Sequence, residues 1–560
     1  MINKIIEELF IKNGIEDIKV SKSNRPDLCD YQSNDIFKIA KKEGKSPIEV
    51  GKEVELKIND IKNFNDYFES VQFVAPGFLN IKINNNFICN VLRKMSSDNK
   101  FNIQLPEKSE TFVVDYCGAN VAKPLHVGHM RTTIVGESIA RIIRFMGHKT
   151  ICDVHLGDYG LQIGEVIYAI LEDKIPLEDI DINYLDVAYP KMSARCKEDE
   201  KLKEECARIT KELQDGNEEY RKLWKKILDV SVEDIKKNCD YLGAKFDYWY
   251  GESDAYPYIP KIEKILNEKG LLRQSEGALV VDEEPTDKKE IPPLLFKKSN
   301  GAYLYASTDL ACLLQRKEDF NPDHVLYVTD LRQALHFEQV FRTIEKCGIF
   351  KRTQLEHLGY GTVNGLDGKP FKTREGTAPK LESLYNDIKE IFISKKEENK
   401  NLSNEDLDKI VNSILKYGDL QNSKEKDYIF NIEKFSDTIG KTGPYILYTY
   451  LRVNKILKDN CYTQKDLSSK IYNESDRNLR MKLFDVEDYI YLAYNNRNPF
   501  YLADYVYDLC LLVNNFYQNN NISNLTDEEN KNDWLYVLNL SNRIIKEVLD
   551  LLVIQIPSKM

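Results

Sequence analysis

Hydrophobic and polar positions recur with two different periods along the first 105 residues. Apolar residues spaced three or four apart predict amphipathic helices, and an alternating stretch predicts paired strands. We expect helices at 2–12, 34–42 and about 47–57, followed by strands within 70–84. This mixed pattern predicts a small α/β domain that ends near residue 105.

The pattern changes in the middle of the chain. Short apolar runs at 112–114 and 150–155 predict buried strands, and each is followed by a helical pattern. Residues 172–245 are charged and helical in period, which indicates an inserted helical segment. Beyond residue 300 the pattern predicts strands at 302–306, 324–329 and 355–363 and helices at 309–318 and 334–347. This β-α-β-α-β succession predicts a doubly wound parallel sheet.

From about residue 385 helical periodicity continues to the C-terminus. At 560 residues the chain exceeds what one hydrophobic core organises, so we expect about three domains. The predicted fold class is multidomain α/β, with a doubly wound Rossmann-type domain between an N-terminal α/β domain and a C-terminal α-helical bundle. The predicted ranges are 1–105, 106–385 with a helical insertion at about 172–250, and 386–560.

Composition narrows the class of protein. Residues are 42% hydrophobic and 30% charged, which is typical of a globular chain with sizeable cores. The net charge of −11 argues against non-specific coating of nucleic acid, although local basic patches can still hold an RNA. The 11 cysteines are scattered, which indicates reduced thiols, and no apolar run approaches the ~18 residues of a membrane span. We expect a cytoplasmic protein without a membrane partner.

The stretch Thr111–Arg131 carries the clearest chemical signal. A strand is followed by a Gly/Ala/Asn/Pro loop and the start of a helix, where free backbone N–H groups and the helix dipole favour an anion. His126 and His129 lie three residues apart on the first turn, so both can face the same phosphate. Gly128 between them allows a flat ring or a backbone to approach closely. This arrangement predicts a nucleotide site.

Two histidines at this spacing also occur as zinc ligands or as ordinary helix-start residues. Zinc is disfavoured because no two cysteines form a CxxC pair and the chain has no HExxH motif. Elsewhere, Gly440-Lys441-Thr442 is similar to the end of a phosphate-binding P-loop, but Phe435 stands where that motif requires a glycine. We therefore expect no dedicated protein metal site.

Asn120, Lys123 and Pro124 precede the histidines, so the segment ending at Arg131 reads N-x-A-K-P-x-H-x-G-H-x-R. This segment resembles the HIGH motif of class I aminoacyl-tRNA synthetases, and its extended form resembles that of the arginyl-tRNA synthetases. The resemblance covers essentially the whole chain. It implies that the ATP phosphates are bound, and catalysis is supported, by Lys123, His126, Gly128 and His129.

An arginine substrate needs carboxylates against its planar guanidinium, an aromatic wall for its stem, and polar groups at its amino-acid end. The resemblance implies that Glu252, Tyr305 and Asp309 surround the guanidinium. It places Asn120, His126 and Gln333 near the backbone of the amino acid. Taken alone, Asp309 would serve equally well as a helix cap.

A turn-rich basic loop, Asn364–Gly376, follows the last predicted strand. Its glycines favour mobility, and its cations supply charge for a pyrophosphate leaving group. The loop resembles the degenerate KMSK loop of the family, with Arg374 in place of the last lysine. The expected catalytic residues here are Lys369, Lys372 and Arg374, and the expected ATP-binding residues are Phe371, Lys372 and Thr373.

Two stretches depart from the family pattern or imitate it. Cys117-Gly118-Ala119 replaces the usual serine- and proline-containing lead-in to the asparagine. Lys191-Met192-Ser193-Ala194 is similar to a KMSK signature, but it lacks the last lysine and lies among helix formers. We expect this second stretch to be a solvated helix.

The predicted C-terminal helices carry aromatic residues beside basic ones. Such residues can stack on unpaired bases, although an aromatic stripe is more often core. The resemblance implies an anticodon-binding domain here, a terminal methionine near the anticodon, and an N-terminal domain that contacts the corner of the tRNA. The expected tRNA-binding residues are Asn34, Tyr445, Tyr448, Arg452 and Met560.

The resemblance implies a reaction in two steps. The arginine carboxylate attacks the α-phosphate of ATP to give arginyl-adenylate and pyrophosphate, and a ribose hydroxyl at the tRNA 3′ end then takes the arginyl group. Neither step needs a protein nucleophile, so catalysis rests on positioning and charge stabilisation. Magnesium is expected with ATP, held mostly by phosphate oxygens and water. The expected partners are ATP, L-arginine and the tRNA for arginine, which is bound before activation, and the expected state is a monomer.

Two other interpretations belong to different functional classes. A catalytically repurposed synthetase-like protein would bind RNA or arginine as a regulator, and a stand-alone nucleotidyltransferase would use the same chemistry on a small acid. The intact set of Asn120, His126, His129 and Asp309 disfavours the first. The long helical C-terminus disfavours the second, so we expect an aminoacyl-tRNA ligase.

Overall fold

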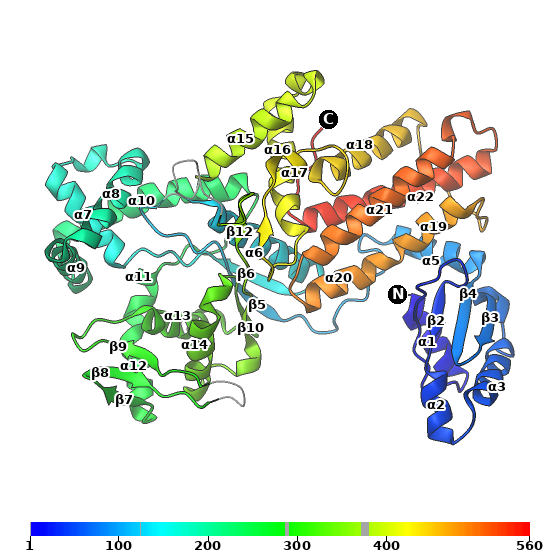
Figure 1. Cartoon of the computed structure of the whole chain (residues 1–560), viewed down its shortest axis with the longest axis horizontal. Coiled ribbons are helices and arrows are strands. Elements are labelled where there is room, and N and C mark those ends of the chain that lie inside the picture. The colour runs from blue at the N-terminus through cyan, green and yellow to red at the C-terminus, as the bar shows by residue number, and fades with distance from the viewer. Residues whose placement is uncertain (1, 124, 286–289, 371–379) are drawn as a thin grey trace. The chain divides into compact units, whose positions relative to one another are not determined.

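Figure 1 shows a computed structural model of the chain, which describes residues 2–123, 125–285, 290–370 and 380–560. The chain folds into two units. The first unit comprises Met1–Leu105, Ile446–Leu492 and Asp504–Val548, and the second comprises Pro106–Tyr445, Ala493–Ala503 and Leu549–Met560. The three domain ranges expected from the sequence stay predictions.

The N-terminal part of the first unit is an antiparallel sheet with the strand order β1-β2-β4-β3. Its strands are β1 Ser21–Lys22, β2 Tyr31–Ser33, β3 Phe68–Val74 and β4 Phe78–Ile83. Its helices are α1 Ile2–Lys12, α2 Ile36–Glu43, α3 Pro47–Asn59, α4 Phe64–Tyr67 and α5 Asn85–Ser97. On β4, Leu79, Ile81 and Ile83 are fully buried, because alternate side chains of a strand point to one face. The predicted mixture of helices and strands is confirmed.

The rest of the first unit comes from helices near the C-terminus. Most residues of five helices belong to it: α18 Gly443–Asp459, α19 Glu474–Leu483, α20 Asp485–Asn495, α21 Phe500–Asn519 and α22 Glu528–Leu551. One end of each of α18, α20, α21 and α22 belongs to the second unit. Arg477 on α19 pairs with both carboxylate oxygens of Asp30, at 2.6 and 2.8 Å, and so joins this helix to the N-terminal sheet. The predicted helical C-terminus is confirmed.

The second unit is built on a parallel sheet with the strand order β11-β10-β5-β6. Figure 1 labels three of these strands, β10, β5 and β6. The strands are β5 Thr111–Asp115, β6 Lys149–Asp153, β10 His324–Tyr327 and β11 Leu355–His357. Helices α6 Val127–Phe145, α13 Tyr305–Phe320 and α14 Ala334–Lys346 lie between strands in the chain. Phe112, Val113 and Val114 of the central strand β5 are fully buried, as expected of an apolar run in a parallel sheet. This is the predicted doubly wound fold.

Helices dominate the segment between the two halves of this sheet. They are α7 Leu161–Asp173, α8 Ile182–Glu198, α9 Glu200–Asp215, α10 Glu218–Tyr241, α11 Glu252–Ala255 and α12 Ile259–Glu268. A small antiparallel sheet follows, made of β7 Leu272–Ser275, β8 Ala278–Val281 and β9 Leu294–Lys297. The KMSK-like stretch at Lys191 lies within α8, as predicted, although its Met192 is buried.

The strand predicted at 302–306 is wrong. Tyr303 makes only an isolated bridge to Lys297, and α13 already begins at Tyr305. Alternation over five residues is too short to distinguish a strand from the start of a helix. Asp309 therefore lies inside α13, and Leu304 occupies the N-cap position that was the alternative assignment for Asp309.

The strand predicted at 355–363 is two separate strands, β11 and β12 Val363–Asn364. β12 pairs in parallel with β13 Tyr428–Ile429, so the chain beyond about residue 385 is not helical throughout, as had been predicted from its periodicity. A two-residue strand has too few positions to show a period. The remaining helices are α15 Leu381–Ser394, α16 Asn404–Leu420 and α17 Ile432–Phe435.

Within the described part of the chain, no helix has both the length and the apolar character to cross a membrane.

Candidate active site

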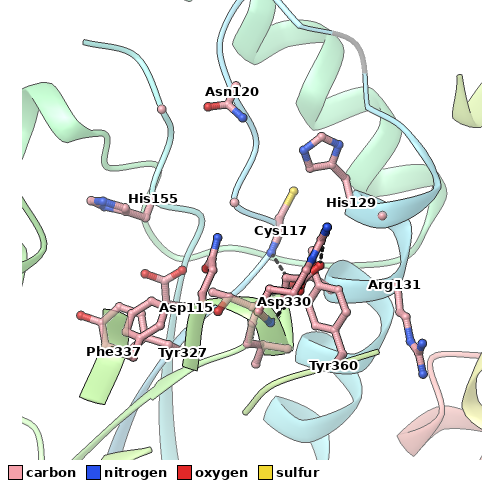
Figure 2. Close-up of a pocket in the computed structure, with 18 of the residues that line it drawn as sticks. Asp115, Cys117, Asn120, His129, Arg131, His155, Tyr327, Asp330, Phe337 and Tyr360 are labelled. Atoms are coloured by element: carbon pink, nitrogen blue, oxygen red, sulfur yellow. Dashed lines mark hydrogen bonds and ion pairs between the residues drawn. The ribbon is translucent and has the colours of Figure 1, made fainter. Parts of the chain in front are cut away.

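A cavity of about 710 Å³ lies at the carboxyl ends of β5 and β10, beside the N-terminus of α6 (Figure 2). This edge of an open α/β sheet is where ligands usually bind. The sequence-predicted residues that line it are Asn120, His126, Gly128, His129, Glu252, Tyr305, Asp309 and Gln333. The fold thus brings together residues that the chain order separates widely.

The two histidines share the first turn of α6. His126 is the N-cap, and its Nδ1 accepts a hydrogen bond from the backbone N–H of Gly128 at 3.1 Å. His129 Nδ1 accepts from the backbone N–H of His126 at 3.2 Å, and the ring centroids are 3.9 Å apart. A Cβ at Gly128 would come within 2.9 Å of the His126 ring, so the glycine makes room for it. Both rings are held at the helix start and line the cavity.

The environment keeps both rings neutral. Burial lowers the pKa of His126, and the charge of Lys123 adds to the effect. Burial also lowers the pKa of His129 well below its ordinary value, helped by His126 and Lys123. Because Nδ1 is the acceptor on each ring, the proton of each neutral ring lies on Nε2. The pair can therefore offer two N–H donors to an anion at the positive end of the helix.

Asn120 lies in the loop between β5 and α6 and packs against Gly157. The two residues form a bridge, and a Cβ at Gly157 would come within 2.3 Å of Asn120 Oδ1. The Gly157 carbonyl also accepts from Gln162 Nε2 at 3.2 Å. Gly157 therefore permits the close approach that places Asn120 in the cavity wall. In Figure 2, Asn120 and His129 lie toward one end of the cavity, and Tyr327 and Phe337 lie toward the other.

Carboxylates gather in the part of the cavity formed by α11 and α13. Glu252 begins α11, and burial raises its pKa to about 7 against the opposing charge of His155. The negative charges of Asp158 and Asp309 act in the same direction as burial. Tyr305 lies one helical turn before Asp309 on the same face of α13. Two carboxylates beside one aromatic ring form a site suited to a planar cation.

A buried ion pair underlies this acidic region. Arg316 Nη2 lies 2.6 Å from Asp115 Oδ2 and 2.8 Å from Asp153 Oδ2, and all three side chains are buried. Ligand atoms of Asp115, Asp153 and His155 lie within 4.8 Å of one another, a spacing that a metal ion could use. Because Arg316 already pairs with both carboxylates, the cluster fits an internal ion-pair network better than a cation site.

Arg131 joins α6 to the chain that leads into the basic loop. Its fully buried guanidinium donates to the carbonyls of Gly361 at 2.6 Å and Lys424 at 3.2 Å. Its Nε lies 3.5 Å from Asp419 Oδ2 at the end of α16. The Arg131 side chain therefore links α6, which carries the histidines, to the segments that immediately precede β12 and β13.

The predicted cationic residues are less well placed than the histidines. Neither Lys123 nor Lys369 is among the described residues that line the cavity. Lys123 Nζ lies 6.0 Å from the centroid of the Tyr189 ring, and the backbone N–H of Lys369 donates to Asp367 Oδ1 at 3.1 Å. The roles of both lysines stay predictions. The other predicted loop residues, Phe371, Lys372, Thr373 and Arg374, lie outside the described residues.

Cys117, which departs from the family pattern, lines the cavity with a φ of 78°. Its backbone N–H donates to Thr132 Oγ1 at 3.2 Å, and its sulfur lies 3.9 Å from that of Cys239 on α10. The side chain is buried in the wall beside the predicted ligand positions.

The predicted tRNA-binding residues are divided between the units. Asn34, Tyr448 and Arg452 belong to the first unit, and Tyr445 and Met560 belong to the second. The Arg452 guanidinium lies 5.0 Å from the centroid of the Tyr448 ring and 5.3 Å from that of Tyr517.

Tyr448 and Tyr517 are 42% and 38% exposed, so this cation–aromatic cluster presents ring surface on which bases could stack. Asn34 is exposed after β2. The contacts of these residues with tRNA stay predictions.

His336 and Tyr327 are among the cavity residues that sequence reasoning did not assign. His336 follows Gln333 by one helical turn, and both residues line the cavity. His336 Nε2 lies 2.5 Å from Asp309 Oδ2. Tyr327 ends the buried strand β10, and its ring packs against Phe337 at 4.7 Å. The sequence signal that could have found them was their position just at or after the end of a predicted parallel strand, where polar residues commonly contact a ligand.

Each part of the chain matches a known family model. Residues 90–432 match the catalytic domain of tRNA synthetases class I (R), residues 446–560 match the DALR anticodon binding domain, and residues 1–83 match the arginyl tRNA synthetase N terminal domain. The first of these matches spans all of the residues that line the cavity.

Relatives match over the full length. The arginine–tRNA ligase of Agathobacter rectalis is 41% identical and that of Alkaliphilus oremlandii is 39% identical, each covering 100% of this chain and at least 99% of the relative. The crystal structure of arginyl-tRNA synthetase from Plasmodium falciparum superposes with a TM-score of 0.81 at 27% identity, covering 100% and 99% of the two chains. The Thermus thermophilus arginyl-tRNA synthetase shares the fold, with a TM-score of 0.81 at 21% identity and full coverage of both chains.

Proposed function

Because the chain belongs to the class I arginyl-tRNA synthetases, we propose that it activates arginine with ATP and transfers it to the 3′ end of its tRNA at the cavity beside α6. The chain is an aminoacyl-tRNA ligase, and the proposal concerns which residues carry the chemistry. The observation that supports it most strongly is the meeting of the paired histidines and the two carboxylates, Glu252 and Asp309, in one cavity.

The histidine end of the cavity suits ATP. Two neutral Nε2–H donors at a helix N-terminus can bind phosphate oxygens and follow the charge that develops on them during attack. Neutral rings keep their donor hydrogens in fixed directions, because Nδ1 of each is already used by the backbone. We assign His126, His129 and Gly128 to the nucleotide, with Lys123 and the 369–374 loop supplying positive charge.

The carboxylate end suits the side chain of arginine. Glu252 and Asp309 can each accept N–H bonds from the planar guanidinium, with Tyr305 against its stem. Asn120 and Gln333 lie in the same cavity, where they can bind the amino and carboxylate groups of the substrate. This orientation directs the arginine carboxylate toward the histidine end. Attack on the α-phosphate then requires positioning alone, without a protein nucleophile.

Magnesium is proposed as the companion of ATP, where it would neutralise charge on the pyrophosphate. The described carboxylates Asp115 and Asp153 are held by Arg316, so phosphate oxygens and water are the better ligands. We further propose that the enzyme acts as a monomer, because a single chain supplies every residue assigned to the cavity. We also propose a cytoplasmic location, because scattered cysteines are typical of a reducing compartment.

A repurposed regulator without activity is not favoured, because the full-length relatives are arginine–tRNA ligases. The test is ATP–pyrophosphate exchange by the purified chain, run with each of several amino acids in the presence and absence of its tRNA. We expect exchange with arginine, and the family resemblance predicts that it needs tRNA. Absence of exchange with every amino acid would show that the proposed activity is wrong.

A further inference from the structure

Asp309 and His336 form a hydrogen-bonded pair in the wall of the cavity. His336 Nε2 lies 2.5 Å from Asp309 Oδ2, within hydrogen-bond distance. Asp309 lies in the second turn of α13 and His336 lies in the first turn of α14. The bond therefore joins two helices, α13 and α14, that both contribute residues to the cavity wall.

The pair uses only one oxygen of the carboxylate. Within the part of the chain that the structure describes, Asp309 Oδ1 has no hydrogen-bond partner, and the side chain is 16% exposed. Fixing Oδ2 limits rotation of the carboxylate and so fixes the direction of Oδ1. A guanidinium needs acceptors in fixed directions, because its N–H groups are coplanar and cannot turn toward them.

The imidazole is itself held in place. The Phe337 ring lies edge-on to the His336 ring, with a centroid distance of 5.4 Å. The same Phe337 ring stacks on the His357 ring, with a centroid distance of 4.9 Å. Burial disfavours the charged form of His336, but the hydrogen bond and charge of Asp309 outweigh burial and raise the pKa.

We propose that His336 is a positioning residue for the amino acid, which orients Asp309 so that Oδ1 meets the guanidinium of arginine. The inference rests on the proposed function, since it assigns a supporting residue to the same pocket. It predicts that His336 affects the use of arginine without affecting the use of ATP.

The test compares variants in arginine-dependent ATP–pyrophosphate exchange with tRNA present. His336→Gln retains an N–H donor near the position of Nε2, whereas His336→Leu removes the donor and His336→Asn has a side chain too short to reach Oδ2. We expect the Leu and Asn variants to raise KM for arginine about 10- to 100-fold, with KM for ATP within about twofold of wild type. The Gln variant should recover most of the loss. Should His336→Leu not fold, the Gln and Asn pair decides the question.

His324→Gln is the matched control, because His324 lies at the opposite end of β10 and contacts Glu110 at 3.2 Å. Its kinetic constants should equal those of wild type. An unchanged KM for arginine in the Asn and Leu variants would overturn the inference, as would a Gln variant as impaired as Asn. If wild type itself shows no arginine-dependent exchange, the proposed function is wrong, and the inference about His336 is then wrong as well.

Discussion

The backbone N–H of His126 donates to Nδ1 of His129, so one histidine of the motif caps the helix turn that also carries the other. This bond assigns the proton of His129 to Nε2, toward the cavity. The same residue therefore has a structural role through one nitrogen and a proposed catalytic role through the other.

Substitution can separate these two roles. His129→Asn places an amide oxygen near the position of Nδ1 but has no group at Nε2, whereas His129→Ala loses both. We expect both variants to reduce arginine-dependent exchange about 10²- to 10³-fold, because each loses a donor to the reacting phosphate. The Ala variant should also be less stable, by about 0.5–2 kcal/mol, because a helix-start N–H loses its acceptor. Full activity in His129→Asn would contradict the assignment of Nε2.

The pKa of Glu252 predicts how arginine binding depends on pH. Burial raises that pKa to about 7 in the empty site, and a bound guanidinium must lower it because it favours the ionised form. Arginine therefore binds the ionised carboxylate, and below pH 7 binding must first remove a proton. We expect KM for arginine to be about tenfold higher at pH 6 than at pH 8.

The measurement is steady-state exchange between pH 6 and pH 8, with KM for ATP as the internal control. Glu252→Gln should raise KM for arginine at every pH and flatten its dependence on pH. A wild-type KM for arginine that does not change over this range would show that Glu252 does not titrate there.

Lys416 predicts a pH dependence of stability. Its ammonium is fully buried on α16 and donates to the carbonyl of Val553 at 2.7 Å, and burial lowers its pKa to about 7. The unfolded chain keeps this proton up to its ordinary pKa near ~10.4. Between these values the unfolded state binds more protons than the folded state, so the residue's contribution to stability rises with pH.

Melting curves of wild type and Lys416→Met between pH 7 and pH 9 test this prediction. The stability of wild type relative to the variant should rise by about 1 kcal/mol per pH unit. Lys409→Met is the control, because Lys409 lies on the same helix but is only half-buried and pairs with Glu405, so the variant should show no such trend. A difference between wild type and Lys416→Met that does not change with pH would contradict the shifted pKa.

The cluster of Arg452, Tyr448 and Tyr517 predicts an effect on tRNA alone. Arg452→Ala removes a cation that lies over two exposed rings, and we expect KM for tRNA in aminoacylation to rise about tenfold, as expected for one lost stacking contact. Arg452→Lys keeps the charge without the planar group and should give an intermediate value. The constants for arginine and ATP, measured at saturating tRNA, should not change. Wild-type affinity for tRNA in the Ala variant would remove this cluster from the binding surface.

Local patterns predicted most of the elements. The apolar run of β5, the periodic helix α14 and the charged helical insertion are all expressed in neighbouring residues, where side-chain period reports the backbone directly. The predictions failed at Tyr305, where two alternating tyrosines start a helix, and at Tyr428–Ile429, a strand whose partner β12 lies far away in the chain.

The sequence by itself determined the spacing of His126 and His129, and through the family resemblance it identified Glu252 and Asp309 as carboxylates for arginine. Only the tertiary structure decided which charges meet: Asp309 with His336, and Arg316 with Asp115 and Asp153. These contacts join residues far apart in the chain, and the pKa values of Glu252 and Lys416 depend on burial. Distance and desolvation arise only when the whole chain has packed, so no local pattern could have predicted them.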